Sequence, residues 1–186
     1  KIGMRNPLFR YIFSLLITFI SLWYSDALFA YQVNKTDAGV EIKWNTNSTT
    51  YYVNTSGGPS GSLSAVQAAM QTWTDVSTSP FTFNYGGTTS STAYGTNDGI
   101  DIVCFGSINT TGVVGQNTYW FNTSSGQLGD SDVKFNTNYQ WVTDGSANGY
   151  DVQNVATHEL GHSLSLADLY SSADTEKTMY GNTSNG

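Results

Sequence analysis

The sequence is poor in the residues that most often supply charge, crosslinks and metal ligands. Seven of its 186 residues are lysine or arginine, two are histidine, three are proline and one is cysteine. A single cysteine excludes an internal disulfide. Because Cys104 lies in the apolar run 100–105, we expect a buried thiol rather than a nucleophile.

Basic residues are scarcest after the N-terminus. Residues 31–186 contain four lysines, no arginine and thirteen acidic residues, so their net charge is 4 − 13 = −9. Such a surface repels nucleic acid and anionic lipid. The composition therefore predicts a protein that binds no nucleic acid and has no stable association with a membrane.

The N-terminus resembles an export signal. Three basic residues precede the uncharged, largely apolar run 11–25, and small residues that suit cleavage follow, up to Ala27 or Ala30. A membrane anchor is the alternative, but a spanning helix needs about 20 apolar residues, and Asp26 closes this run. We predict an N-terminal extension and secretory signal peptide at 1–30, and a secreted, extracellular protein.

The remaining chain, 31–186, contains no repeat or linker and is predicted to form one domain. A near-continuous apolar run at 100–105 indicates a central strand that is buried on both faces. Clustered or alternating aromatic and β-branched residues predict strands at several places: 40–44, 50–53, 81–85, 113–121 and a short one at 133–135.

Two helices are predicted around these strands. From about Ser62, apolar residues recur on one helical face, and Ser60 or Ser62 can cap its first amides. A second helix begins at Asp151, whose carboxylate suits a helix N-terminus. The order of strand, helix, several strands and helix predicts an α+β fold in which a mixed sheet of about five strands is packed by two main helices.

Both histidines of the chain lie in one five-residue run of the second helix. His158 and His162 are four residues apart, and Glu159, one of only three glutamates, lies between them. Imidazoles at this spacing share a helix face and can hold one metal ion. The pattern can also arise by chance on an amphipathic helix. Its use of every histidine in the chain favours the metal.

The run His158, Glu159, His162 predicts a catalytic zinc site. Such a site needs a third protein ligand and an open position for water. Zinc acidifies that water and polarises a carbonyl. Glu159 follows His158 directly and is placed to take the proton of the attacking water and give it to the departing amine. This chemistry hydrolyses a peptide bond.

Beyond these residues the chain resembles the metzincin metalloproteases, particularly the matrixin-like group. Their extended motif is H-E-x-x-H-x-x-G-x-x-H, in which Asp occupies the last place in some small bacterial secreted enzymes. Asp168 stands at that place here, and Met179 matches the Met-turn beneath the metal. The resemblance implies a zincin-like fold and a secreted zinc endopeptidase. It also implies His158, His162 and Asp168 as ligands of one catalytic ion.

The chain departs from the family pattern at several points. Ser165 replaces the usual glycine, where a positive φ costs a side chain about 1 kcal/mol, so a differently shaped turn is expected. Asp174 and Glu176 are the alternative third ligands. Only five residues follow Gly181, so the catalytic domain is expected to be minimal or short at its C-terminus. Calcium has a candidate site at two exposed loop carboxylates near Gly129, Asp130 and Asp132.

The resemblance also points to a substrate cleft. Family members bind extended peptides by strand addition, which suggests that the strand from Val113 and Val114 onward pairs with substrate. An ordinary edge strand explains the same pattern. Tyr180, beside Met179, either shapes the specificity pocket or packs. The expected partner of the monomer is a protein or peptide substrate.

Two other functions remain open at this point. A surface dense in Asn, Thr, Ser and aromatic residues also suits a non-catalytic extracellular binding module, such as one for glycans. That reading leaves the His-Glu-x-x-His run without a reason. Alternatively, Ser165 and the short C-terminus are compatible with a degenerate metzincin that binds metal without protease activity.

Overall fold

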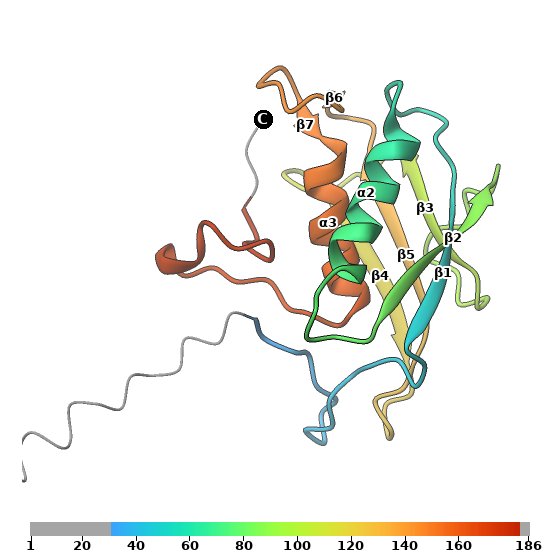
Figure 1. Ribbon diagram of the computed structural model, residues 1–186, viewed down its shortest axis with the longest axis vertical. Helices are drawn as coiled ribbons and strands as arrows, with labels where there is room; N and C mark the ends of the chain where they lie inside the picture. Colours follow the sequence, from blue (N-terminus) through green and yellow to red (C-terminus); the bar gives the residue numbers. More distant parts are fainter. Residues whose placement is uncertain (1–30, 183–186) are drawn as a thin grey trace, which may run out of the picture. The chain divides into compact units, whose positions relative to one another are not determined.

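The computed structural model describes residues 31–182, in which two helices lie side by side on one face of a five-stranded sheet (Figure 1). In chain order the elements are β1 Ser48–Val53, α2 Ser62–Thr74, β2 Thr82–Thr88, β3 Asp101–Gly106, β4 Gly115–Phe121, β5 Leu128–Asn136, β6 Trp141–Val142, β7 Tyr150–Asp151, α3 Val152–Ser163 and a 3-10 turn at Ser172–Asp174.

The sheet is mixed, and its strand order is β2-β1-β3-β5-β4. The first four strands in that order pair in parallel, and β4 joins β5 antiparallel. β3 lies in the middle and is buried over Asp101–Phe105, which confirms the predicted central strand. β4 lies at an edge of the sheet, beside the helix α3. The predicted α+β fold of five strands and two main helices is confirmed.

One strand prediction was wrong, and another was too short. Residues 40–44 form only isolated bridges, Lys35 with Glu41 and Lys43 with Gln127, because no neighbouring strand runs beside them. The strand expected at 133–135 is instead nine residues long, since β5 begins at Leu128. Its polar first half hid it from the sequence pattern.

The two helices are joined through the core. Val66 and Met70 of α2 are buried, as the apolar spacing predicted. Trp73, on the same face, donates its indole N–H to the carbonyl oxygen of Thr157 in α3 at 2.7 Å. The expected serine cap is absent, because the N-cap is Gly61, in a left-handed conformation without a side-chain cap. This packing fixes α3 beneath the edge strand β4.

Two further expectations can be compared with the described residues, and a third cannot. Cys104 is buried in β3, and burial raises the pKa of its thiol to about 11, as befits an inert core residue. Within residues 31–182, no helix has the length and apolarity that crossing a membrane requires. The predicted signal peptide at 1–30 lies outside the described residues.

Candidate metal centre

The helix α3 carries both histidines and is fixed at its N-terminus by the predicted cap. The side chain of Asp151 accepts a hydrogen bond from the Asn154 amide at 2.9 Å. Val155 and Leu160 are buried against the sheet and α2. Among the polar residues of α3, Gln153 and Asn154 are exposed and the two histidines are half-buried, whereas Thr157, Glu159 and Ser163 are buried.

The helix ends in a turn that leads to Asp168. Leu164 is the C-cap, and the amides of Ser165 and Leu166 donate to the carbonyls of His162 (2.7 Å) and Gly161 (3.1 Å). This pair of bonds is the Schellman motif, whose C′ residue is left-handed and usually glycine. Ser165 adopts that conformation itself, with φ 63°, so the turn is not reshaped. Its buried hydroxyl has no hydrogen-bond partner.

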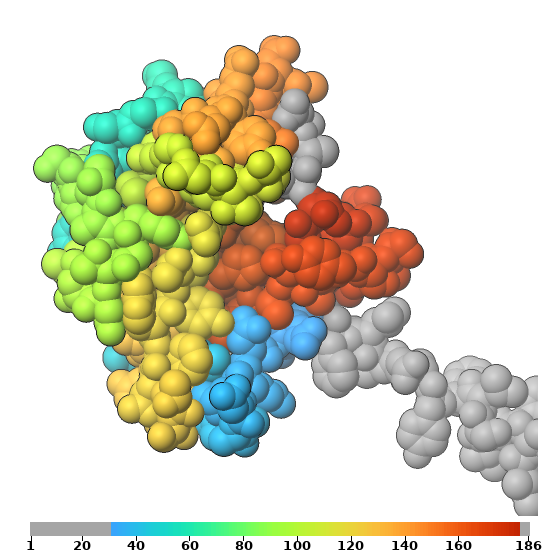
Figure 2. All heavy atoms as spheres, turned by 180° about the vertical axis from the view of Figure 1, so that it is seen from behind, coloured from blue at the N-terminus to red at the C-terminus, as the bar shows by residue number. Residues whose placement is uncertain are grey.

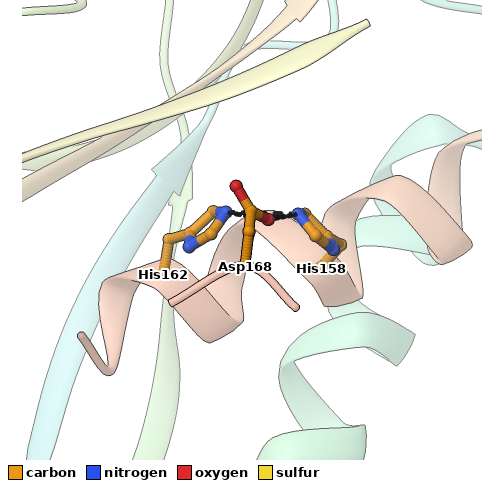
Figure 3. Close-up of side chains that lie close together, drawn as sticks. All are labelled: His158, His162 and Asp168. Atoms are coloured by element: carbon orange, nitrogen blue, oxygen red, sulfur yellow. Dashed lines mark hydrogen bonds and ion pairs between the residues drawn. The ribbon is translucent and has the colours of Figure 1, made fainter. Parts of the chain in front are cut away.

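Beyond this turn, three side chains converge on one point (Figure 3). The Nε2 atoms of His158 and His162 are 3.1 Å apart. Oδ1 of Asp168 lies 3.1 Å from the first and 3.4 Å from the second. Among residues 31–182 no other group of three His, Cys, Asp or Glu side chains offers ligand atoms this close together. The structure does not bring the alternatives here: Asp174 pairs with Lys177, and Glu176 is exposed.

Backbone carbonyls orient both rings. Nδ1 of His158 lies 2.9 Å from the carbonyl oxygen of Thr178, and Nδ1 of His162 lies 2.7 Å from that of Leu166. A carbonyl oxygen only accepts, so each Nδ1 carries a proton and donates it. In the neutral rings, each Nε2 is then an unprotonated acceptor. Both lone pairs face the Asp168 carboxylate.

This arrangement fits a zinc ion. Oδ1 of Asp168 is buried and accepts no hydrogen bond, so it and the two nitrogens form three unpaired acceptors that repel one another. Bonds of about 2.0–2.2 Å to a tetrahedral zinc would place neighbouring ligand atoms roughly 3.3 Å apart, close to the spacing observed.

Glu159 lies beside this centre and is buried, with 5% of its surface exposed. Burial raises the pKa of its carboxyl above the ordinary value, although the neighbouring His158 and His162 work against that rise. The carboxylate lies against Gly115 of β4, where an added β-carbon would stand 2.6 Å from Oε1. The absence of a side chain at residue 115 therefore leaves the room that Glu159 occupies.

A single cleft contains all of these groups. It has a volume of about 980 Å³, and both the three converging side chains and Glu159 line it. Val113, Val114 and Tyr180 line it too, and their contact with a substrate stays a prediction. Figure 2 shows the hollow between the chain near residues 110–120 and the red chain near 170–180. β4 thus forms one wall, opposite the C-terminal segment.

Comparison with known families supports the same conclusion. The family model described as matrixin matches residues 43–185, which is most of the chain. The chain belongs to the matrixin family. No curated protein matches it. Matrixins are zinc metalloproteases, so the resemblance carried by the histidine motif, Asp168 and Met179 is confirmed at the level of the family.

The matrixin domain also contains buried carboxylates outside the cleft. Asp130 and Asp132 were expected in an exposed loop, but both lie in β5 and are buried. Their oxygens accept from backbone amides of the segment 95–102, and Asp101 of β3, also buried, accepts from Ser131. Oδ1 of Asp130 has no hydrogen-bond partner. Calcium binding at Asp130 and Asp132 stays a prediction.

Sequence reasoning missed several groups of the matrixin site. The carbonyls of Thr178 and Leu166 have no signature in the sequence, since every residue carries one. The space at Gly115 was equally invisible. Tyr170, whose hydroxyl donates to Oδ2 of Asp168 at 3.0 Å, could have been noticed from its place two residues after the third motif position.

Proposed function

We propose that this matrixin domain is a secreted zinc-dependent endopeptidase that hydrolyses peptide bonds in protein or peptide substrates. The observation that carries the proposal is the convergence of two bare imidazole nitrogens and one unpaired carboxylate oxygen within 3.4 Å of one another. Family membership supports a metalloprotease in general. The cleft around these atoms is open to a substrate.

His158, His162 and Asp168 would hold the metal through Nε2, Nε2 and Oδ1. When bound, zinc acidifies a water molecule towards a pKa of about 7 and polarises the substrate carbonyl. The Thr178 and Leu166 carbonyls keep both Nδ1 protons in place, so the lone pairs of the rings stay directed at the site. The negative charge of Asp168 would offset part of the positive charge of the zinc ion. The ion would then be a slightly weaker Lewis acid than one held by three histidines.

Glu159 is the proposed proton carrier. Its carboxylate follows His158 directly in α3, lines the same cleft and lies against Gly115. A carboxylate in this place can take a proton from the attacking water and then deliver it to the departing amine nitrogen. Only 5% of the surface of Glu159 is exposed, which limits its contact with bulk water.

The edge strand is the proposed substrate-binding element. β4 pairs with β5 along one edge only, and Gly115, Gln116 and Asn117 line the cleft along the other. An extended peptide can add to such an edge through main-chain hydrogen bonds. The scissile bond would then cross the three converging side chains. Main-chain pairing requires an unfolded or flexible stretch of the substrate.

The experiment compares wild type with Glu159→Gln and Glu159→Ala on a casein-type substrate, after metal analysis of the purified protein. We expect stoichiometric zinc in all three proteins and a loss of about 10²–10⁴-fold or more in kcat for the variants. Glu41→Gln, which changes an exposed glutamate, is the matched control and should keep full activity.

The outcomes separate the alternatives. Absence of zinc from wild type at stoichiometric loading would leave a non-catalytic binding module. Zinc without cleavage by wild type, or equal cleavage by wild type and Glu159→Ala, would leave a degenerate metzincin. Secretion and a monomeric state belong to the same proposal. N-terminal sequencing of exported protein, with a mature start near residue 31, and its mass in solution test them.

A further inference from the structure

The third ligand of the proposed zinc site has a hydrogen-bond donor of its own. Oδ1 of Asp168 faces the two histidines, and Oδ2 accepts the hydroxyl hydrogen of Tyr170 at 3.0 Å. Asp168 lies outside any helix or strand, and 31% of its side chain is exposed. Without a partner, such a carboxylate could rotate and present either oxygen.

Tyr170 is itself held in place, although 66% of its surface is exposed. The preceding residue, Leu169, donates to the carbonyl of Met179 at 2.8 Å and accepts from the amide of Gly181 at 3.0 Å. These two bonds place the segment after Asp168 alongside the Met-turn. The backbone of Tyr170 is thereby fixed relative to the floor of the site.

The ring of Tyr170 packs directly on Gly181. A β-carbon at residue 181 would stand 2.5 Å from Cε1 and 2.7 Å from Cζ of that ring. Real β-carbons do not approach an aromatic ring so closely, so any side chain at 181 would displace the phenol. Glycine at this position is thus a steric requirement of the ring that hydrogen-bonds Asp168.

We infer that Tyr170 is a positioning residue that fixes the Asp168 carboxylate in its metal-facing orientation, with Gly181 as the surface on which its ring rests. The inference rests on the proposed zinc site and adds to it a connection between the Met-turn and the third ligand. Hydrogen-bond partners of metal ligands commonly account for about 10- to 100-fold in metal affinity.

The test measures zinc affinity by competition with a chromogenic chelator for wild type, Tyr170→Phe, Gly181→Ala and the double variant. Tyr170→Phe removes only the hydroxyl, and Gly181→Ala displaces the ring without altering a hydrogen-bonding group. We expect about 10-fold or greater weakening in each single variant. The double variant should bind no more weakly than the weaker single variant, because both changes remove the same hydrogen bond.

Two controls make the result specific. Tyr85→Phe removes the hydroxyl of another partly exposed tyrosine, in β2 and outside the cleft, and should leave zinc affinity unchanged. Thermal unfolding in chelator should be alike for wild type and Tyr170→Phe. A merely structural tyrosine would instead lower the metal-free stability and leave zinc affinity intact.

Unchanged zinc affinity in Tyr170→Phe would overturn the inference while leaving the proposed zinc site standing. Additive losses in the double variant would overturn the role of Gly181. If wild type itself fails to bind zinc, the proposed function fails and the inference fails with it. The three failures are therefore distinguishable from one another.

Discussion

The sulfur of Met179 packs against Gly161 so closely that no β-carbon fits between them. Gly161 directly precedes the ligand His162 in α3, and Met179 is buried. The contact therefore fixes how closely the Met-turn approaches the helix. The preceding residue, Thr178, uses its carbonyl to orient His158. Gly161 thus determines where that carbonyl lies.

Gly161→Ala should therefore destabilise the protein even though alanine favours a helix. We expect overpacking against Met179 to cost about 1–3 kcal/mol of unfolding free energy, measured by urea denaturation in chelator. Gly129→Ala is the matched control, since a β-carbon at residue 129 meets no atom within 4 Å. Equal stabilities of the two variants would show that the turn has room to move.

Ser165 is predicted to be a site of stored strain. Ser165→Gly should raise the unfolding free energy by about 1–2 kcal/mol, because glycine tolerates φ 63° and the unpaired hydroxyl is lost. Ser165→Ala removes the hydroxyl alone and should stabilise less. The urea concentration at the midpoint of unfolding should fall from glycine to alanine to serine at residue 165. That order would show that both the positive φ and the unpaired hydroxyl destabilise the protein. Alanine matching glycine would assign the whole effect to the hydroxyl.

Asp168 is predicted to be the third ligand. Asp168→Ala should weaken zinc binding by at least about 100-fold in chelator competition, since it leaves only two protein ligands. Asp174→Ala and Glu176→Ala should bind as wild type does, because neither carboxylate lies with the histidines. Loss of zinc in either of these two variants, with retention in Asp168→Ala, would reassign the site.

Stability is predicted to depend on pH through the buried carboxylates of β3 and β5. Burial raises the pKa of Asp101 and of Asp132 to about 6, above the value of about 3.9 expected in the unfolded chain. The folded state then holds more protons between these values. The unfolding free energy should therefore fall as pH rises from about 4 to 6, by at most about 3 kcal/mol for each group.

Asp101→Asn tests the source of that pH dependence. An amide mimics the neutral acid and can keep the bonds to Thr49 and to the Ser131 amide, so the fall should be smaller. Urea denaturation in chelator between pH 4.5 and 7 measures it, with the exposed Asp37→Asn as control. If the unfolding free energy of Asp101→Asn depends on pH as steeply as that of wild type, Asp101 is not the source.

Calcium binding has its own test. Added calcium at pH 7 should raise the melting temperature if Asp130 and Asp132 bind it.

The N-terminal segment is predicted to stabilise the turn that carries Asp168. The Asn34 amide donates to the carbonyl of Ser165, and the Ala167 amide donates to that of Gln32. Asn34→Pro removes one of these donors and should cost about 1 kcal/mol of unfolding free energy. It should also weaken zinc binding measurably. Asn34→Ala keeps the amide and is the control; a similar loss there would implicate the side chain instead.

Much of the fold could be predicted because its signals are local. The apolar stripe of α2, the cap at Asp151 and the buried run of β3 are each determined within a few neighbouring residues. β5 was underestimated for the opposite reason. Asp130 and Asp132 look like loop residues until the amides that donate to them are known. Those amides come from segments about 30 residues away.

The sequence by itself determined the motif: two histidines four apart on a helix, with a glutamate between them, need only the helical period to share a face. It also placed Asp168 and Met179 downstream of the histidines at the positions that the family pattern gives to the third ligand and the Met-turn. Tertiary structure alone decided that Asp168 and not Asp174 meets the histidines, that Thr178 and Leu166 set the tautomers, and that Gly115 leaves space for the glutamate. Asp168 and Leu166 lie within ten residues of the histidines, and their positions depend on the turn at Ser165. Thr178 and Gly115 reach α3 from segments distant in sequence, so their contacts depend on how the whole chain packs.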